Sequence, residues 1–154
     1  MPIANLLLVD DERQFVEILS QRLARRDFAV TCAYGGQEAL ERLDNQEAVD
    51  VVILDVKMPG MDGVEATRLI KEKHPLVEIV MLTGRGEVNS AVEAIKSGAF
   101  DYLMKPCDLD QLIVKVNGAA KRKNDRESKI LEVRIRPYIT DREKDKLISA
   151  ILES

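Results

Sequence analysis

Five short apolar runs alternate with five segments whose apolar residues recur at helical spacing, and this alternation constrains the fold more than any other feature. The clearest run, Val51 to Leu54, is apolar at every position, as in a strand buried on both faces. The other runs are Leu6 to Val9, Phe28 to Cys32, Val77 to Leu82 and Phe100 to Met104. Strands and helices in strict alternation predict an α/β fold, in which a parallel sheet is covered by helices on both faces.

Glycine, proline and a capping residue mark the expected helix ends. Gly35-Gly36 separates the second strand from the helix that follows it. The third helix should stop before His74-Pro75, because proline disfavours helix in the preceding residue. Gly98 suits a left-handed terminator of the fourth helix, and Asp108 suits the cap of a fifth.

Polar residues follow four of the five expected strands. In open parallel sheets, the ligand site lies beyond the carboxyl ends of the strands. The polar residues at these ends are Asp10, Asp11, Asp55, Thr83 and Lys105. Three acids, one hydroxyl and one amine are therefore expected at the same edge of the sheet.

These groups together suit the chemistry of phosphoryl transfer. Three neighbouring carboxylates repel one another unless a cation offsets their charge, and Mg²⁺ is a hard cation that binds carboxylate oxygens. Lys105 and Thr83 would then hold an anion. The carboxylate of Asp55 can itself act as a nucleophile and form an acyl phosphate.

Four motifs now support a resemblance to a known family. They are Val9-Asp10-Asp11-Glu12, the segment from Leu54 to Gly63, Leu82-Thr83-Gly84, and the segment from Tyr102 to Pro106. In this order and spacing they resemble the receiver domain of bacterial two-component response regulators, over roughly residues 4 to 122. The resemblance implies a flavodoxin-like, doubly wound, five-stranded parallel sheet of order 2-1-3-4-5.

The resemblance also assigns roles to residues. It implies that Asp55 accepts phosphate from a sensor histidine kinase, and that Lys105 pairs with the phosphoryl group. It implies that Mg²⁺ is held by Asp11, Asp55 and the backbone carbonyl of Lys57, with Asp10 acting more through water.

Further roles concern switching and the lifetime of the phosphate. The resemblance implies that Thr83 and Tyr102 form the switch, and that the Lys105–Pro106 peptide is cis. Lys57 lies two residues past Asp55, and Arg85 two past Thr83. We therefore expect both basic side chains at the mouth of the site, where they tune the lifetime of the phosphate.

Structural interpretations of the same residues compete with these roles. Asp10-Asp11 could cap a helix, and we expect Asp11 to cap the first helix as well as bind metal. Thr83 could cap the fourth helix, and Lys105 could extend along the edge of the sheet. Each of these is reasonable alone, but all would have to hold together.

The favoured function is a phosphorylation-dependent switch that controls a downstream protein and catalyses only its own phosphorylation and dephosphorylation. One alternative is an Mg²⁺-dependent phosphohydrolase with an aspartyl-phosphate intermediate, which would need a further acid or base. The sole histidine, His74, is interpreted as structural because no nucleophile accompanies it. The other alternative is a DNA-binding regulator acting through the basic tail.

Residues 123 to 154 lie outside the resemblance and are expected to form a helical extension of a receiver domain at residues 1 to 122. Lys121 to Lys129 should prolong the fifth helix as a solvated face. Leu131, Val133 and Ile135 alternate with charged residues, which fits either a short extended segment or a helix. Pro137 interrupts this segment.

A last, short helix is expected near the end of the chain. Thr140 to Glu143 has the form of a capping box. Behind it lies an apolar stripe of Leu147, Ile148, Ile151 and Leu152. Such a stripe must be buried, so we expect it to pack on the receiver body or on a second copy in a homodimer. The mixed charges around it disfavour contact with DNA.

Composition limits the setting of the protein. The net charge of −4 disfavours nucleic acid and anionic membrane as partners. Two cysteines are too few for a disulfide framework, which favours a reducing compartment. The sequence shows neither a signal peptide nor an apolar run long enough to span a membrane, so we expect a cytoplasmic protein that is not membrane-bound.

Overall fold

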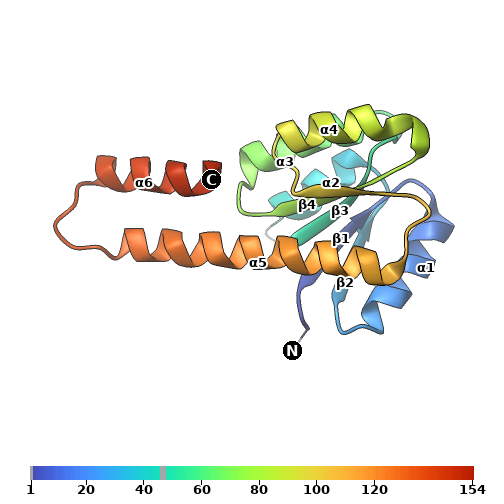
Figure 1. The fold of residues 1–154 in the computed structure, drawn as a ribbon, viewed down its shortest axis with the longest axis horizontal. Coiled ribbons are helices and arrows are strands. Elements are labelled where there is room, and N and C mark those ends of the chain that lie inside the picture. Colours follow the sequence, from blue (N-terminus) through green and yellow to red (C-terminus); the bar gives the residue numbers. More distant parts are fainter. Residues whose placement is uncertain (1, 46–47) are drawn as a thin grey trace.

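The computed structural model describes residues 2–45 and 48–154 and contains a five-stranded parallel sheet flanked by helices (Figure 1). The strand order is β2-β1-β3-β4-β5. The strands are β1 (Asn5–Val9), β2 (Ala29–Ala33), β3 (Val51–Asp55), β4 (Glu78–Thr83) and β5 (Asp101–Met104). The flavodoxin-like fold and the 2-1-3-4-5 order expected from the sequence are thereby confirmed.

The helices form two layers, one on each face of the sheet. They are α1 (Arg13–Ala24), α2 (Gly36–Asp44), α3 (Gly63–Lys73), the 3-10 turn η1 (Arg85–Glu87), α4 (Val88–Lys96), α5 (Leu109–Arg134) and α6 (Asp141–Glu153). Helices α1 and α5 pack on one face, and α2, α3 and α4 on the other. Each face therefore has its own apolar core.

The central strand β3 shows why its sequence is apolar throughout. Val51 and Ile53 face the core beneath α1 and α5, whereas Val52 and Leu54 face the core beneath α2, α3 and α4. Successive side chains of a strand point to opposite faces, so a strand covered on both sides needs apolar residues at every position. This burial fixes the position of Asp55 at the end of the strand.

The expected helix ends are largely confirmed. Helix α3 ends at Lys73, and His74 caps it before the proline. Gly98 follows α4 with a φ of 116°, in the region that favours glycine. The side chain of Asp108 accepts a hydrogen bond from the backbone N–H of Asp110 at 3.1 Å and so caps α5.

The expectation that Asp11 caps the first helix is wrong. The residue at the cap position of α1 is Glu12, whose side chain makes no capping hydrogen bond. It is Asp10 that accepts from the backbone N–H of Glu12, at 3.0 Å. Asp11 is exposed, and its carboxylate is thereby available to a ligand.

Helix α5 is 26 residues long and extends well past the sheet, and α6 folds back along its far half (Figure 1). The segment from Leu131 to Arg134 is therefore helical, and the turn that contains Pro137 follows it. Thr140 caps α6 by accepting from the N–H of Glu143 at 3.1 Å, as the capping-box pattern predicts. The expected boundary between residues 122 and 123 falls inside α5.

One interpretation of a helix face needs correction. Lys121 to Lys129 prolongs α5 as expected, but it is not wholly solvated, because Arg126 is only 6% exposed and reaches the buried Glu78. Two apolar side chains of the helices, Ile18 of α1 and Val92 of α4, are also exposed.

Candidate functional site

The strand ends bring four of the expected site residues to one edge of the sheet. Asp55 and Thr83 are the last residues of β3 and β4. Asp10 directly follows β1, and Lys105 directly follows β5. The backbone N–H of Lys105 donates to the carbonyl of Thr83 at 2.7 Å, which fixes the start of the β5–α5 loop against β4.

Three carboxylates lie together at this edge. Asp10, Asp11 and Asp55 each offer one oxygen, and these oxygens all lie within 4.8 Å of one another. Asp10 and Asp55 are buried, whereas Asp11 is exposed at the rim. A cluster of oxygen ligands with one side open to solvent fits a hard divalent cation that keeps some of its water.

The ammonium group of Lys105 is shared between two of these carboxylates. Its Nζ lies 2.6 Å from Asp10 Oδ2 and 3.4 Å from Asp55 Oδ1. It also lies 4.5 Å from the centre of the Phe15 ring, a cation–π distance. Burial lowers the pKa of Lys105, but the two carboxylates more than offset this, so its pKa is raised and the group stays charged.

Asp55 has an elevated pKa of about 6. Burial is the largest cause, and the negative charge of Asp10 adds to it; Lys105 acts in the opposite direction. A cation that binds beside this buried carboxyl group would lower its pKa, because the positive charge favours the ionised form.

Thr83 and Tyr102, the two expected switch residues, lie in different environments. The Thr83 side chain is fully buried, and its hydroxyl donates to the carbonyl of Gly84 at 3.1 Å rather than to Asp55. The Tyr102 ring is half-buried against the core beneath α2, α3 and α4. Neither residue is directly bound to the carboxylates in this arrangement.

The side chains of Lys57 and Arg85 are exposed, Lys57 on the loop that follows β3 and Arg85 at the start of η1 after β4. They stand on the two segments that flank Asp55 and Thr83. The Lys105–Pro106 peptide is cis, as expected. His74 contacts Asp44 with its Nε2 2.8 Å from the carboxylate, which agrees with a structural role.

Gly63 supports the site in a way that the sequence did not reveal. A Cβ atom at this position would lie 2.5 Å from the carbonyl oxygen of Asp55 and 2.8 Å from Val56 Cα. Helix α3 therefore begins in direct contact with the backbone at the end of β3. In the sequence, Asp62-Gly63 indicates only a turn, because a close approach of two backbone segments leaves no local signal.

A second missed feature is the apolar pocket beside Lys105. Phe15 appears in the sequence only as part of a helical stripe, but its ring contacts the ammonium group of Lys105. The pocket has a volume of about 230 Å³. It is lined by Phe15, Ile18, Leu19, Arg22, Lys105, Pro106 and Cys107.

A parallel α/β sheet with an acid cluster and a lysine at its carboxyl edge defines the class of this protein. Residues 6–117 match the family model of the response regulator receiver domain. The chain belongs to this family. It contains the receiver domain of a two-component response regulator, a phosphoryl-accepting regulatory module.

Sequence relatives of known function are regulators. The chain is 38% identical over 117 residues to the regulatory protein AtoC of Escherichia coli K12. This match covers 76% of this chain and 25% of AtoC. It is 37% identical over 112 residues to the DNA-binding transcriptional regulator NtrC of the same organism. That match covers 73% of this chain and 24% of NtrC. The chain thus spans about a quarter of the length of the curated relatives it matches.

Solved structures agree with this assignment. A response regulator receiver domain protein from Clostridium thermocellum is 35% identical with a TM-score of 0.75, and covers 79% of this chain and 98% of that one. NtrX from Brucella abortus, solved in complex with ADP, is 30% identical with a TM-score of 0.77. That match covers 97% of this chain and 33% of NtrX, so it extends over α6.

None of the described helices is long and apolar enough to cross a membrane.

Proposed function

We propose that Asp55 accepts a phosphoryl group from a sensor histidine kinase in an Mg²⁺-dependent reaction, and that residues 1–122 act as the receiver with 123–154 as its helical extension. The observation that carries the proposal is the placement of Asp10, Asp11 and Asp55 within 4.8 Å of one another, with Lys105 3.4 Å from Asp55. No other group of three acids, histidines or cysteines with this spacing was found among the described residues.

The acidic cluster and the Lys57 loop provide the ligands for the metal. Asp11, Asp55 and the backbone carbonyl of Lys57 would bind Mg²⁺ directly, with Asp10 acting more through water. Bound Mg²⁺ would offset the three negative charges and polarise the phosphoryl oxygens. The donor set consists of hard oxygen atoms, which this cation prefers.

Asp55 is the nucleophile in the proposed reaction. A carboxylate oxygen of Asp55 attacks phosphorus, the bond from phosphorus to the donor nitrogen breaks, and an acyl phosphate forms on Asp55. Lys105 is close enough to transfer its contact from Asp55 to a phosphoryl oxygen. Thr83 then turns its hydroxyl from Gly84 toward the phosphoryl group, and Tyr102 moves further inward, which forms the switch.

The alternatives have less support. A phosphohydrolase acting on outside substrates needs a further acid or base, and His74, the sole histidine, pairs with Asp44. We therefore propose that the receiver catalyses only its own phosphorylation and dephosphorylation. Its two cysteines are free, and we place the protein in the cytoplasm.

The output partner proposed for this chain is a protein. The net charge of −4 and the mixed charges of α6 disfavour direct contact with DNA. NtrC is described as a DNA-binding regulator, but this chain matches only about a quarter of that protein. The DNA binding named for NtrC can therefore reside in the three quarters of NtrC that this chain does not match.

Intact mass spectrometry tests the proposal. After incubation with a small phosphodonor and Mg²⁺, the chain is expected to gain the mass of one phosphoryl group. A chelator that removes Mg²⁺ should prevent this gain. A chain that stays unlabelled with Mg²⁺ present, or that labels equally in the chelator, would contradict the proposal.

Lys57 and Arg85 should lengthen the life of the acyl phosphate, because long basic side chains at the mouth of the site shield it from water. Replacing both with alanine is expected to speed dephosphorylation roughly fivefold, as expected from the loss of about 1 kcal/mol of charge interaction. The loss of label over time gives the rate. Replacing the exposed Arg25 and Lys121 with alanine removes the same charge elsewhere and should leave the rate unchanged. Equal rates in both double variants would count against the role.

A further inference from the structure

A group of charged residues is buried at the opposite end of β4 from the acidic cluster. Glu78, the first residue of β4, is wholly buried. Lys71 Nζ lies 2.9 Å from its Oε1, Arg122 Nε donates to its Oε2, and Arg126 Nη1 lies 3.4 Å from its Oε1. We call these four residues the cation socket, because three positive charges surround one negative charge.

The socket carries more positive than negative charge. Burial and repulsion by Arg122 both lower the pKa of Arg126, and Glu78 offsets this only in part. Burial likewise lowers the pKa of Lys71. Arg126 itself is only 6% exposed, and a buried positive charge is costly unless a negative group lies nearby.

The C-terminal end of α6 lies where this negative group is needed. Arg126 Nη2 donates to the backbone carbonyl of Ser154 at 2.5 Å. Ser154 caps α6, and the carbonyls at a helix C-terminus carry a partial negative charge. Arg126 thus joins Glu78 of the sheet to the end of the last helix.

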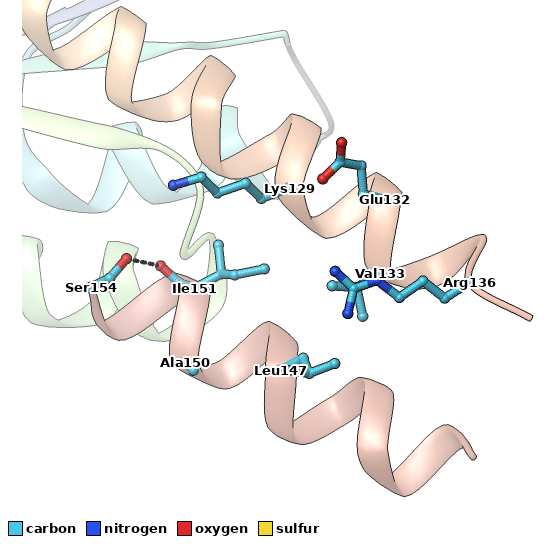
Figure 2. Close-up of a pocket in the computed structure, with 8 residues that line it drawn as sticks. All are labelled: Lys129, Glu132, Val133, Arg136, Leu147, Ala150, Ile151 and Ser154. Atoms are coloured by element: carbon cyan, nitrogen blue, oxygen red, sulfur yellow. Dashed lines mark hydrogen bonds between the residues drawn. The ribbon is translucent and has the colours of Figure 1, made fainter. Parts of the chain in front are cut away.

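The remaining contact between α6 and α5 is shallow. Leu147 and Ile151 of the apolar stripe face the chain's own α5, where Val133 is only 3% exposed (Figure 2). However, none of the thirteen described residues of α6 is buried, and Leu147 is 38% exposed. A pocket of about 380 Å³ lies between the two helices. Figure 2 shows the side chains that line it. Because its apolar side chains are only partly buried, α6 gains less free energy from docking than a fully packed helix would. Its docking can therefore be reversed.

Two elements connect the socket to the acidic cluster. Strand β4 runs from Glu78 in the socket to Thr83 at the site. Helix α4 starts just after Thr83 and η1, and its last turn, with Ile95 and Lys96, lines a pocket of about 470 Å³ together with the end of α6. A shift of Thr83 or α4 would therefore alter the pocket that α4 and the end of α6 line together.

We propose that α6 is a reversible clasp, held by its C-terminal end in the cation socket, and that an acyl phosphate on Asp55 loosens it through β4 and α4. This regulation rests on the function proposed above. Release of α6 uncovers the apolar face of α5 around Val133. The clasp thus couples the state of Asp55 to the accessibility of α5.

Hydrogen exchange of the full chain tests the coupling. Backbone amides of α6 are expected to exchange about tenfold faster when Asp55 carries phosphate than when it does not. Intact mass, measured on the same samples, gives the phosphoryl content. If the chain is phosphorylated while α6 exchange stays the same, the coupling is wrong and the function stands. If the chain takes up no phosphoryl group, both proposals are overturned.

Two variants test the clasp without phosphate. Arg126→Gln removes the link to Ser154, and Ile151→Asp opens the helix pair without touching Glu78. Both are expected to speed α6 exchange about tenfold while β4 amides remain protected, because each variant removes one of the contacts that hold α6 against α5. Arg142→Gln makes the same charge change at an exposed position of α6 and should behave as wild type. Wild-type exchange of α6 in Ile151→Asp and Arg126→Gln would overturn the clasp.

Discussion

Asp55→Asn is expected to abolish phosphoryl incorporation from both kinase and small donors. The amide keeps the size and shape of the side chain but lacks the negatively charged oxygen that attacks phosphorus. The effect should be complete rather than partial, because the neighbouring Asp10 is occupied by Lys105 and by the backbone N–H of Glu12. Intact mass after incubation with donor and Mg²⁺ measures the result.

A matched control separates the nucleophile from its surroundings. Asp62 lies close by in the sequence and caps α3 by accepting from the N–H of Glu65 at 2.9 Å. Asparagine caps helices about as well as aspartate, so Asp62→Asn should fold and label normally. Normal labelling of Asp55→Asn would show that another residue is the acceptor.

The sequence predicts the site because its main residues lie at or just after the carboxyl ends of strands, and the strands are recognisable. Apolar runs such as Val51 to Leu54 identify buried strands, and the carboxyl ends of parallel strands meet at one edge. Asp55, Thr83 and Lys105 are therefore placed together by topology alone. The strand order could be predicted only from the family resemblance, because alternating strands and helices are compatible with several strand orders.

Contacts between distant side chains could not be predicted in this way. Arg126 looks like one charge in a solvated run until Glu78, which is 48 positions away, is placed beside it. The position of Phe15 over Lys105 depends on how α1 is rotated on the sheet. Gly63 is explained only by the carbonyl of Asp55 that it contacts. Each of these features depends on packing between elements rather than on the pattern within one.

Metal-free protein is expected to lose stability as pH rises from about 4 to above 6, through Asp55. Its pKa is raised from 3.8 to about 6 in the folded state, so the folded chain holds this proton more tightly than the unfolded chain does. Below about pH 4 both states are protonated and Asp55 imposes no penalty. Above pH 6 both are ionised, and the penalty is roughly 3 kcal/mol, since each pKa unit is worth about 1.4 kcal/mol.

Urea unfolding of wild type and Asp55→Asn, in chelator and at several pH values, measures this effect. The difference between the two proteins isolates Asp55 from the other carboxyl groups, and the variant should be more stable by roughly 3 kcal/mol above pH 6 and nearly equal at pH 4. Adding Mg²⁺ should stabilise the wild type by about 2.7 kcal/mol at a hundred times its Kd. The variant should gain much less, because it lacks the third carboxylate of the cluster. A difference between the two proteins that stays constant from pH 4 to 8 would show that the folded state does not raise the pKa of Asp55.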